Sequence, residues 1–264
     1  MKTFQWPLRA LLLVTLLQLV SCTKNSDTSA TDSISLETSS DATVANEFSN
    51  CKLRRIYQSY GEGYTNATAV FTYDHRGNPV SVLFEPYLNG LHYFDYDKNG
   101  RLVSYRPYSD YTGDVKHVYA YDANNRIIRD SLFRGTDDYI VDLFVSTFTY
   151  DAQGRIVKEN IRNTYNGVND QGVRPPLAPA RNPTYTYDAR GNLAVKGWKS
   201  SSYDNKVSIF RTHPIFQFIH RNYSQNNSSV QAKYNSKGLP LTVLPGNDTF
   251  FALPNVNKAI YDCQ

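Results

Sequence analysis

The sequence has 264 residues, of which 41% are hydrophobic, 20% charged and 14% aromatic, and its formal net charge is +4. This balance excludes a disordered or collagen-like chain for most of the length, and it allows one domain of about 200 residues with accessory segments. The aromatic residues are unevenly divided, since there are 21 Tyr and 13 Phe against 2 Trp. Aromatic residues suit half-buried strands, so this excess favours β-structure.

Residues 1–21 have the composition of a secretory signal peptide. Lys2 and Arg9 precede the apolar run 10–20, which is too short to span a bilayer. The run ends in LVSC at residues 19–22, which resembles a bacterial lipoprotein lipobox. The resemblance implies cleavage before Cys22, acylation of Cys22 and a stable anchor in the lipid bilayer, expected to be the outer membrane. An ordinary secretory signal with an incidental cysteine is the alternative.

Cleavage changes the charge argument. It removes Lys2 and Arg9 and no acid, so the formal net charge falls from +4 to +2. Nucleic-acid binding needs a strong basic patch, so we expect no nucleic-acid partner.

Residues 22–50 are expected to form the lipidated cysteine and a flexible tether. Twelve of the 28 residues from Thr23 to Asn50 are Ser or Thr, and five acids stand against the single cation Lys24. Such a stretch cannot bury enough apolar surface to order itself.

Two cysteines remain at the ends of the region 51–264. Outside the cytoplasm, an even pair such as Cys51 and Cys263 favours a disulfide. Two unpaired buried thiols are the alternative, because some secreting bacteria live in reducing niches.

A repeated motif organises the region 51–264. Six segments, the last one weaker, carry aromatic residues one and three positions before an Asp or Asn, which is followed by two turn residues and then Gly or Asn. The pairs that begin and end these turns are Asp74 and Gly77, Asp97 and Gly100, Asp122 and Asn125, Asp151 and Gly154, Asp188 and Gly191, and Asn235 and Gly238. A recurring motif of this kind indicates a repeat architecture.

The motif has a physical explanation as a β-hairpin. The Asp side chain can accept a backbone N–H two residues on, and Gly takes the left-handed conformation that a type I turn with a G1 bulge requires. Asn125 is the next-best residue for that conformation. Small or polar residues such as Thr72 and Thr149 separate the two aromatic positions, and an apolar residue such as Ile127 follows each turn. The alternation predicts paired strands with the rings on one face.

These motifs resemble the YD repeats of Rhs and teneurin proteins. Together with the lipobox, the chain is similar to the YD-repeat-like lipoproteins of unknown function of Bacteroidota. The resemblance implies an architecture and transfers no catalytic residue. Six hairpins are too few to form the shell that encloses a cargo in Rhs proteins, so toxin encapsulation is not expected.

The fold prediction is an all-β antiparallel meander of repeated hairpins, curled into an open or nearly closed sheet, with one short helix in a C-terminal insertion. If Cys51 and Cys263 pair, residues 53–56 must lie near residues 259–261, because a disulfide needs its Cα atoms within about 7 Å. In a meander of consecutive hairpins, this pairing implies that the sheet closes or nearly closes.

Two insertions interrupt the repeats. Residues 163–183 are proline-rich and predict an extended loop. In the insertion 197–227, the apolar residues 215, 216, 218 and 219 form a helical stripe, for which Thr212 is the predicted cap and Pro214 lies in the first turn.

The second insertion also holds the candidate recognition surface, because loops on a rigid scaffold often carry binding residues. Its members are Trp198, Tyr203, Arg211, His213, His220 and Tyr223. The alternative is that the helix covers the sheet, with Trp198 in the core and the histidines at its margin.

Catalytic and metal-binding patterns are sparse in this sequence. The five histidines include no HExxH pair, and no cysteine remains for a zinc site. Asp110, Asp114, Asp137 and Asp138 lack EF-hand spacing and are interpreted as solvated turn residues. We therefore expect no metal, no cofactor and no catalytic residue.

The function expected from the sequence is a non-enzymatic binding or adaptor lipoprotein of the cell envelope, with a glycan or an envelope protein as its partner. Two alternatives stay open: a purely structural envelope protein and a glycan-acting hydrolase.

Overall fold

The computed structural model describes residues 51–58, 67–85, 91–109, 113–136, 139–165, 172–174, 176–194, 203–228, 233–242, 250–251 and 256–263. The strands are β1 (Cys51–Gln58), β2 (Ala67–Tyr73), β3 (Pro79–Glu85), β4 (Leu91–Tyr96), β5 (Leu102–Ser109), β6 (Gly113–Tyr121), β7 (Ile127–Thr136), β8 (Tyr139–Tyr150), β9 (Ile156–Asn163), β10 (Thr186–Tyr187), β11 (Leu193–Ala194) and β12 (Val256–Cys263). The helical elements are the 3-10 turn η1 (Ile209–Thr212) and the helix α2 (Pro214–His220).

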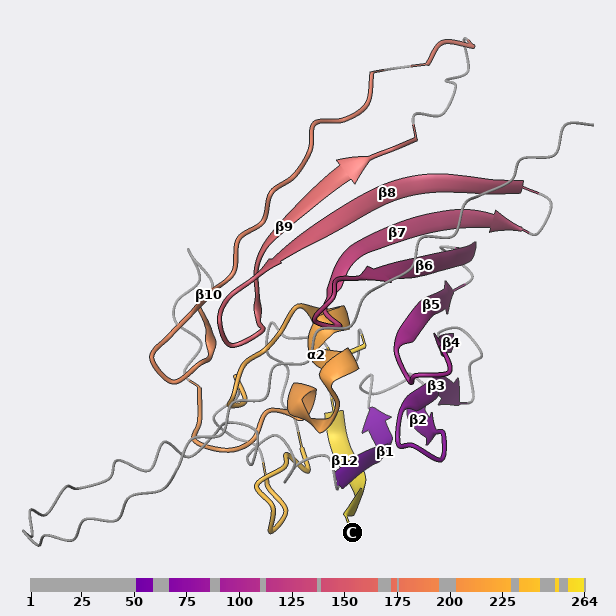
Figure 1. Cartoon of the computed structure of the whole chain (residues 1–264). Helices are drawn as coiled ribbons and strands as arrows, with labels where there is room; N and C mark the ends of the chain where they lie inside the picture. Colours follow the sequence, from indigo (N-terminus) through magenta and orange to yellow (C-terminus); the bar gives the residue numbers. More distant parts are fainter. Residues whose placement is uncertain are drawn as a thin grey trace, which may run out of the picture. The chain divides into compact units, whose positions relative to one another are not determined.

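Ten of these strands form one antiparallel sheet. Its order is β12-β1-β2-β3-β4-β5-β6-β7-β8-β9, and β10 and β11 form a separate small hairpin. The sheet curves around α2 (Figure 1). The predicted all-β meander with one short helix is therefore confirmed. The sheet is open, because no pairing among the described residues joins β9 to β12.

The last strand returns to the first. Strand β12 pairs with β1, with Leu53 opposite Tyr261 and Ile56 opposite Ala259, and Cys51 and Cys263 form a disulfide across 212 residues. The inference that such a pairing requires a closed sheet is wrong. After β9 the chain leaves the sheet and returns as β12, which pairs with the free edge of β1. The two cysteines therefore meet at one edge of the sheet, and β9 forms the opposite edge.

The edge at β9 is covered by the proline-rich insertion. The backbone N–H groups of Glu159 and Ile161 donate to the carbonyls of Pro183 and Arg181, at 3.0 and 2.8 Å. The described residues of this insertion run alongside β9 (Figure 1). Because proline lacks an N–H, a proline-rich covering segment is itself a poor template for a further strand.

The six predicted turns share one hydrogen-bond pattern. In the turn that begins at Asp151, the carboxylate accepts the N–H groups of Gln153 at 3.0 Å and Arg155 at 2.9 Å, and Gly154 donates to the carbonyl of Asp151. The fourth residue of every turn is left-handed, with φ of 77° at Gly154 and 59° at Asn125. The conformation predicted for Gly and Asn is therefore confirmed.

Tyrosine hydroxyls connect most hairpins to the segment before them; the exception is Tyr234 of the sixth hairpin, which donates to Asp204. Tyr96 donates to the carbonyl of Pro79, Tyr121 to that of Leu102, and Tyr150 to that of Ile127, at 2.8, 2.7 and 2.6 Å. The same bond recurs from Tyr73 to Leu53, from Tyr187 to Ile156, from Tyr203 to Leu193 and from Tyr261 to Pro240. We call these seven bonds the tyrosine ladder. Where the preceding turn is one of the six, the acceptor is the fifth residue after its Asp or Asn.

Arginines at the ends of three turns reinforce the ladder. Arg126 donates from Nε to Asp122 of its own turn at 2.8 Å, and its guanidinium lies 5.3 Å from the ring centre of Tyr150 in the next hairpin. Arg101 and Arg155 make the same pair of contacts. Each arginine therefore holds its own turn closed and covers the ladder tyrosine of its neighbour.

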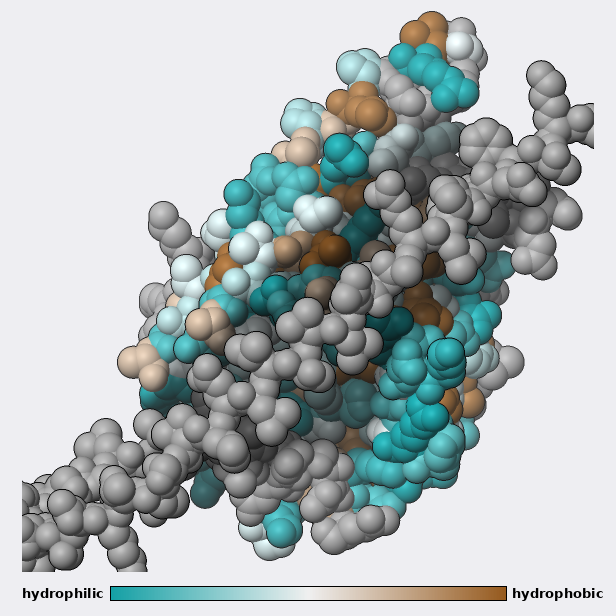
Figure 2. All heavy atoms as spheres, in the orientation of Figure 1, coloured by the Kyte–Doolittle hydropathy of each residue, from teal (hydrophilic) through white to brown (hydrophobic). Residues whose placement is uncertain are grey.

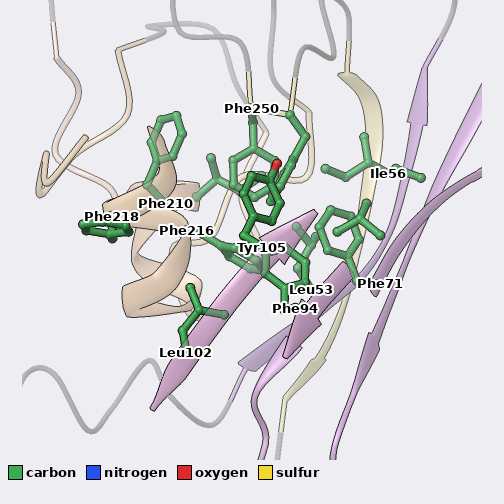
Figure 3. Packing of buried hydrophobic residues seen from close by; sticks show 14 of the residues in the cluster. Leu53, Ile56, Phe71, Phe94, Leu102, Tyr105, Phe210, Phe216, Phe218 and Phe250 are labelled. Carbon is green, nitrogen blue, oxygen red and sulfur yellow. The ribbon is translucent and has the colours of Figure 1, made fainter. Parts of the chain in front are cut away.

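The hydrophobic core lies between the sheet and α2. Phe71 of β2 meets Phe216 of α2 edge-on, with ring centres 5.9 Å apart, and Phe250 stacks on Phe71. Figure 3 shows these rings gathered between the helix and the strands. The short helix therefore covers the inner face of the sheet. In the described part of the chain, no helix is long and apolar enough to cross a membrane.

Replacing Tyr121 by Phe tests the ladder. The substitution removes one hydroxyl and leaves the carbonyl of Leu102 without this donor, which we expect to lower the free energy of unfolding by about 1–2 kcal/mol. The matched control is Tyr93→Phe, because the side chain of Tyr93 is 37% exposed. Chemical denaturation of both variants measures the difference. Equal stability of the two would contradict a stabilising ladder.

Candidate functional site

The N-cap of α2 lies one residue after the predicted cap. It is His213, whose Nδ1 accepts the N–H of Ile215 at 3.2 Å. Thr212 ends η1 and donates its hydroxyl to the carbonyl of Ile209. The prediction of Thr212 as the cap is therefore wrong, because Pro214 occupies the first helical position and the residue before it must be the cap.

The most polar part of the buried inner face surrounds Arg221, the residue that follows α2. Arg221 adopts a left-handed conformation with φ of 53°, and its guanidinium donates to Phe218 in the last turn of the helix. The same group lies 4.5 Å from the ring centres of Phe148 and Phe218. The arginine is thus buried between helix and sheet.

Two buried acids face this arginine from the sheet. Nη2 of Arg221 lies 3.5 Å from Asp130 on β7 and 3.4 Å from Glu159 on β9. Asp130 also contacts Nδ1 of His117 at 2.9 Å, and Glu159 accepts the hydroxyl of Tyr185 at 3.0 Å. We call these five residues the charge cluster.

The two carboxylates of the charge cluster keep Arg221 charged. Burial alone would lower the pKa of Arg221, but Glu159 and then Asp130 raise it above its ordinary value. The arginine therefore stays charged and compensates part of the negative charge of the two carboxylates. A buried ion cluster of this kind is stable only while every member keeps its partners.

The chemistry available to the charge cluster is limited. A carboxylate that accepts from Nδ1 of a histidine fixes the tautomer of the ring, as in general-base catalysis. In the described part of the chain, however, His117 has hydrogen bonds only to Asp130, so no nucleophile accompanies the pair. The described residues also contain no group of three or more His, Cys, Asp or Glu that could hold a metal ion.

Three further histidines are half-buried and pack against core aromatic rings. The ring of His220 lies 5.2 Å from Phe250 and 4.7 Å from Phe251, and its Nε2 has no hydrogen-bond partner among the described residues. Nδ1 of His92 lies 2.7 Å from the hydroxyl of Tyr105. Burial lowers the pKa of His92 and of His213 to about 4, and that of His220 to about 3. All three are therefore neutral at pH 7.

Four members of the predicted recognition surface have structural contacts in this fold. Tyr203 is a member of the tyrosine ladder, His213 caps α2, and His220 and Tyr223 pack against the core. Burial raises the pKa of Tyr223, so its hydroxyl stays protonated. A buried tyrosine hydroxyl usually forms a hydrogen bond within the protein. These four side chains therefore all have contacts within the fold.

The remaining predicted site residues lie elsewhere. Arg211 is part of η1, a short turn on the same insertion. Trp198 and Cys22 lie outside the described residues, as do Asp110, Asp137 and Asp138. Asp114 is exposed at the start of β6.

Sequence reasoning missed the charge cluster. Asp130 and Glu159 follow Arg129 and Lys158 directly and lie on the inner face, so a careful count of strand alternation past each bulge would have placed both acids among core residues. No comparable signal marks Arg221, whose position depends on the left-handed turn after the helix.

Comparisons with known proteins give little further information. No family model matches the chain, and no curated protein does either. A crystal structure of TcdB2-TccC3-Cdc42 is 21% identical with a TM-score of 0.20, over 49% of this chain and 7% of that one. A crystal structure of TcdB2-TccC3-TEV has the same identity and TM-score, over 48% of this chain and 7% of that one.

Arg221→Met tests the charge cluster. The substitution leaves Asp130 and Glu159 buried without their cation, so we expect a loss of about 3–5 kcal/mol in the free energy of unfolding. Adding Asp130→Asn and Glu159→Gln to Arg221→Met removes the unpaired charges and should restore part of the stability. Denaturant titration of both variants measures this. A triple variant no more stable than the single one would contradict the electrostatic explanation.

The three half-buried histidines predict an acid-sensitive fold. Their pKa values lie below the ordinary value of about 6.5 that holds in the unfolded chain. The unfolded state therefore binds more protons between pH 6.5 and about 4, and stability is complete above pH 6.5 and falls as the pH drops through this window.

The measurement is the free energy of unfolding between pH 7 and 4, with an expected loss on the order of 1–3 kcal/mol for each histidine. His220→Phe should make the dependence shallower, because it removes one of the three groups. His75→Gln is the matched control, since His75 is exposed in a turn. Identical pH dependence in the two variants would show that His220 does not contribute.

Proposed function

We propose that this protein is a lipid-anchored lipoprotein of the bacterial cell envelope that acts as a non-enzymatic binding or adaptor module. The lipobox-like residues 19–22 and the polar stretch 23–50 support the anchor and the tether. The hairpin motif, which resembles YD repeats, supports a rigid scaffold, because its arginines donate to its aspartates and its tyrosine hydroxyls donate to backbone carbonyls of the preceding hairpin.

One observation carries the binding role. The strands β7 and β8, of 10 and 12 residues, are longer than β2, β3 and β4, which have 6 or 7. In Figure 1 the far ends of β7, β8 and β9 and the described residues that follow β9 extend past α2. The far end of the sheet at β7–β9 is therefore not covered by the helix (Figure 1).

Apolar side chains are exposed at this end. Tyr165, Val173 and Leu177 have 41, 57 and 46% of their surface exposed, and we call them the distal surface. Figure 2 shows apolar residues among polar ones along this upper end of the molecule. Exposed aromatic and aliphatic side chains beside an extended segment are more typical of a surface that contacts a protein or glycan than of a loop that contacts only solvent. We therefore propose the distal surface as the contact with that partner.

The test places a photo-crosslinking amino acid at Leu177 in the full chain expressed in its bacterial host. We expect one discrete crosslinked species from position 177 and none from the matched exposed position Asn124, which lies in a turn. A glycan array probed with the parent and with Tyr165→Ser/Leu177→Ser covers a carbohydrate partner. If neither method finds binding that depends on these residues, the purely structural alternative is favoured.

The anchor is tested separately with an alkyne-labelled fatty acid. The parent chain should incorporate the label and fractionate with the outer membrane, and Cys22→Ser should do neither. An unlabelled parent would refute lipidation without affecting the crosslinking result.

A further inference from the structure

The outer face of the sheet, opposite α2, carries cations that form no salt bridge with any described residue. Cross-strand pairs place Arg129 opposite Thr147, and Thr147 opposite Asn160. Since Phe148 and Tyr150 point to the core, Thr147 and its cross-strand partners face outward. The same registers put Lys158 and Arg162 on this face of β9, opposite Thr149 and Val145.

Strand β6 continues this surface. Lys116 lies opposite Phe133, and Val118 lies opposite Ser131, which shares the outward side with Arg129. All four cations, Lys116, Arg129, Lys158 and Arg162, are exposed, and none forms a salt bridge in the described part of the chain. Among the described acids of β4–β9, Asp95, which is paired with Arg106, and Asp114 lie on the outer face, and the register also places Asp142 there, opposite Phe133.

Charge is separated across the thickness of the sheet. Arg129 and Lys158 precede Asp130 and Glu159 directly, and alternation sends each cation outward and each acid inward. The inner acids are compensated by Arg221. Among the described residues the outer cations form no salt bridge, so their positive charge is available to a partner outside the sheet.

Apolar side chains border the cations. Val118 and Ile128 are each 38% exposed, and Tyr93 and Val103 on the neighbouring strands are 37% exposed. Ile128 and Val103 are the extra residues of the bulges that follow their turns. Lys116, Val118, Ile128, Arg129, Lys158 and Arg162 together form what we call the outer patch.

We propose that the outer patch docks the domain on the surface of an anionic phospholipid bilayer. Guanidinium and ammonium groups pair with lipid phosphates, the hydroxyls of Thr147 and Thr149 can donate to the same oxygens, and Val118 and Ile128 can reach the boundary between headgroups and acyl chains. The proposal rests on the anchor of the proposed function. The tether expected for the 28 residues 23–50 would keep the domain within about 30 Å of its lipid, which would make a weak contact effective.

The geometry of docking also fits the distal surface. An outer patch held against headgroups turns the inner face and α2 toward the aqueous phase, since they lie on the opposite side of the sheet. The far ends of β8 and β9 then run along the membrane instead of being buried in it.

The experiment measures partition of the full chain carrying Cys22→Ser between buffer and vesicles. One set of vesicles is pure phosphatidylcholine, and the other contains phosphatidylglycerol. At low salt the Cys22→Ser chain should prefer the anionic vesicles. Replacing Arg129, Lys158 and Arg162 by Gln should lower its partition to them by about a hundredfold, because each cation near such a surface contributes about a factor of five.

The matched control replaces Lys98, Lys206 and Lys237 by Gln, which removes the same charge from exposed positions outside the outer patch. The control should keep most of the preference, and both variants should keep the melting temperature of the Cys22→Ser chain. Any binding through residues 1–21 is common to all three chains and cancels in the comparison.

Two results would overturn the proposal: equal losses in the two triple variants, or no preference of the Cys22→Ser chain for anionic vesicles. The second result, if it reverses when the acids of residues 23–50 are replaced by their amides, would identify the tether as the occupant of the outer patch. Failure here is distinguishable from failure of the anchor, because fatty-acid labelling of the parent chain does not depend on the outer patch.

Discussion

The architecture depends on one type of hydrogen bond that recurs along the sheet. In it, the hydroxyl of a tyrosine in one hairpin donates to a backbone carbonyl in the hairpin before it. A hairpin of two short strands is marginal in water by itself. Here Tyr121 satisfies a carbonyl of the preceding hairpin while Arg101 of that hairpin covers its ring. Each repeat is therefore fixed relative to its neighbour by polar contacts as well as by burial, and stability accumulates along the sheet as in other repeat proteins.

This arrangement also explains how the sheet manages its charge. The turn acids accept backbone N–H groups, and in three turns they also accept an arginine of the same turn, so they contribute little to recognition. The inner acids are matched with the arginine that follows the helix. Our two proposals concern the outer face of β6–β9 and the end of β7–β9 beyond α2, where described cations and apolar side chains are exposed.

The local features were predictable from the sequence because their causes are local. Asp151 and Gly154 define a turn within four residues, and the alternation around Tyr150 assigns its ring to the core face. Tyr203 could have been recognised in the same way, since it precedes an Asp that accepts the N–H two residues on. The spacing of the short helix likewise predicted its position to within one residue of the cap.

The long-range features were not predictable in this way. Arg221 meets Asp130 and Glu159 across 91 and 62 residues, and no periodicity records which strand positions a returning helix will cover. The position of β12 was equally unpredictable. In a meander each strand pairs with the strand before it in the sequence, whereas β12 crosses to the opposite edge of the sheet and pairs with β1. Only the placement of the two cysteines hinted at this crossing.

The return of β12 imposes an order on folding. Chains emerge from the ribosome N-terminus first, so β1 is made about two hundred residues before the strand that covers its free edge. Throughout that interval β1 presents unpaired backbone groups, which are a template for aggregation. Completion of the fold is therefore a late, C-terminal event, and a chain truncated before residue 256 leaves this edge open however well its other hairpins have formed.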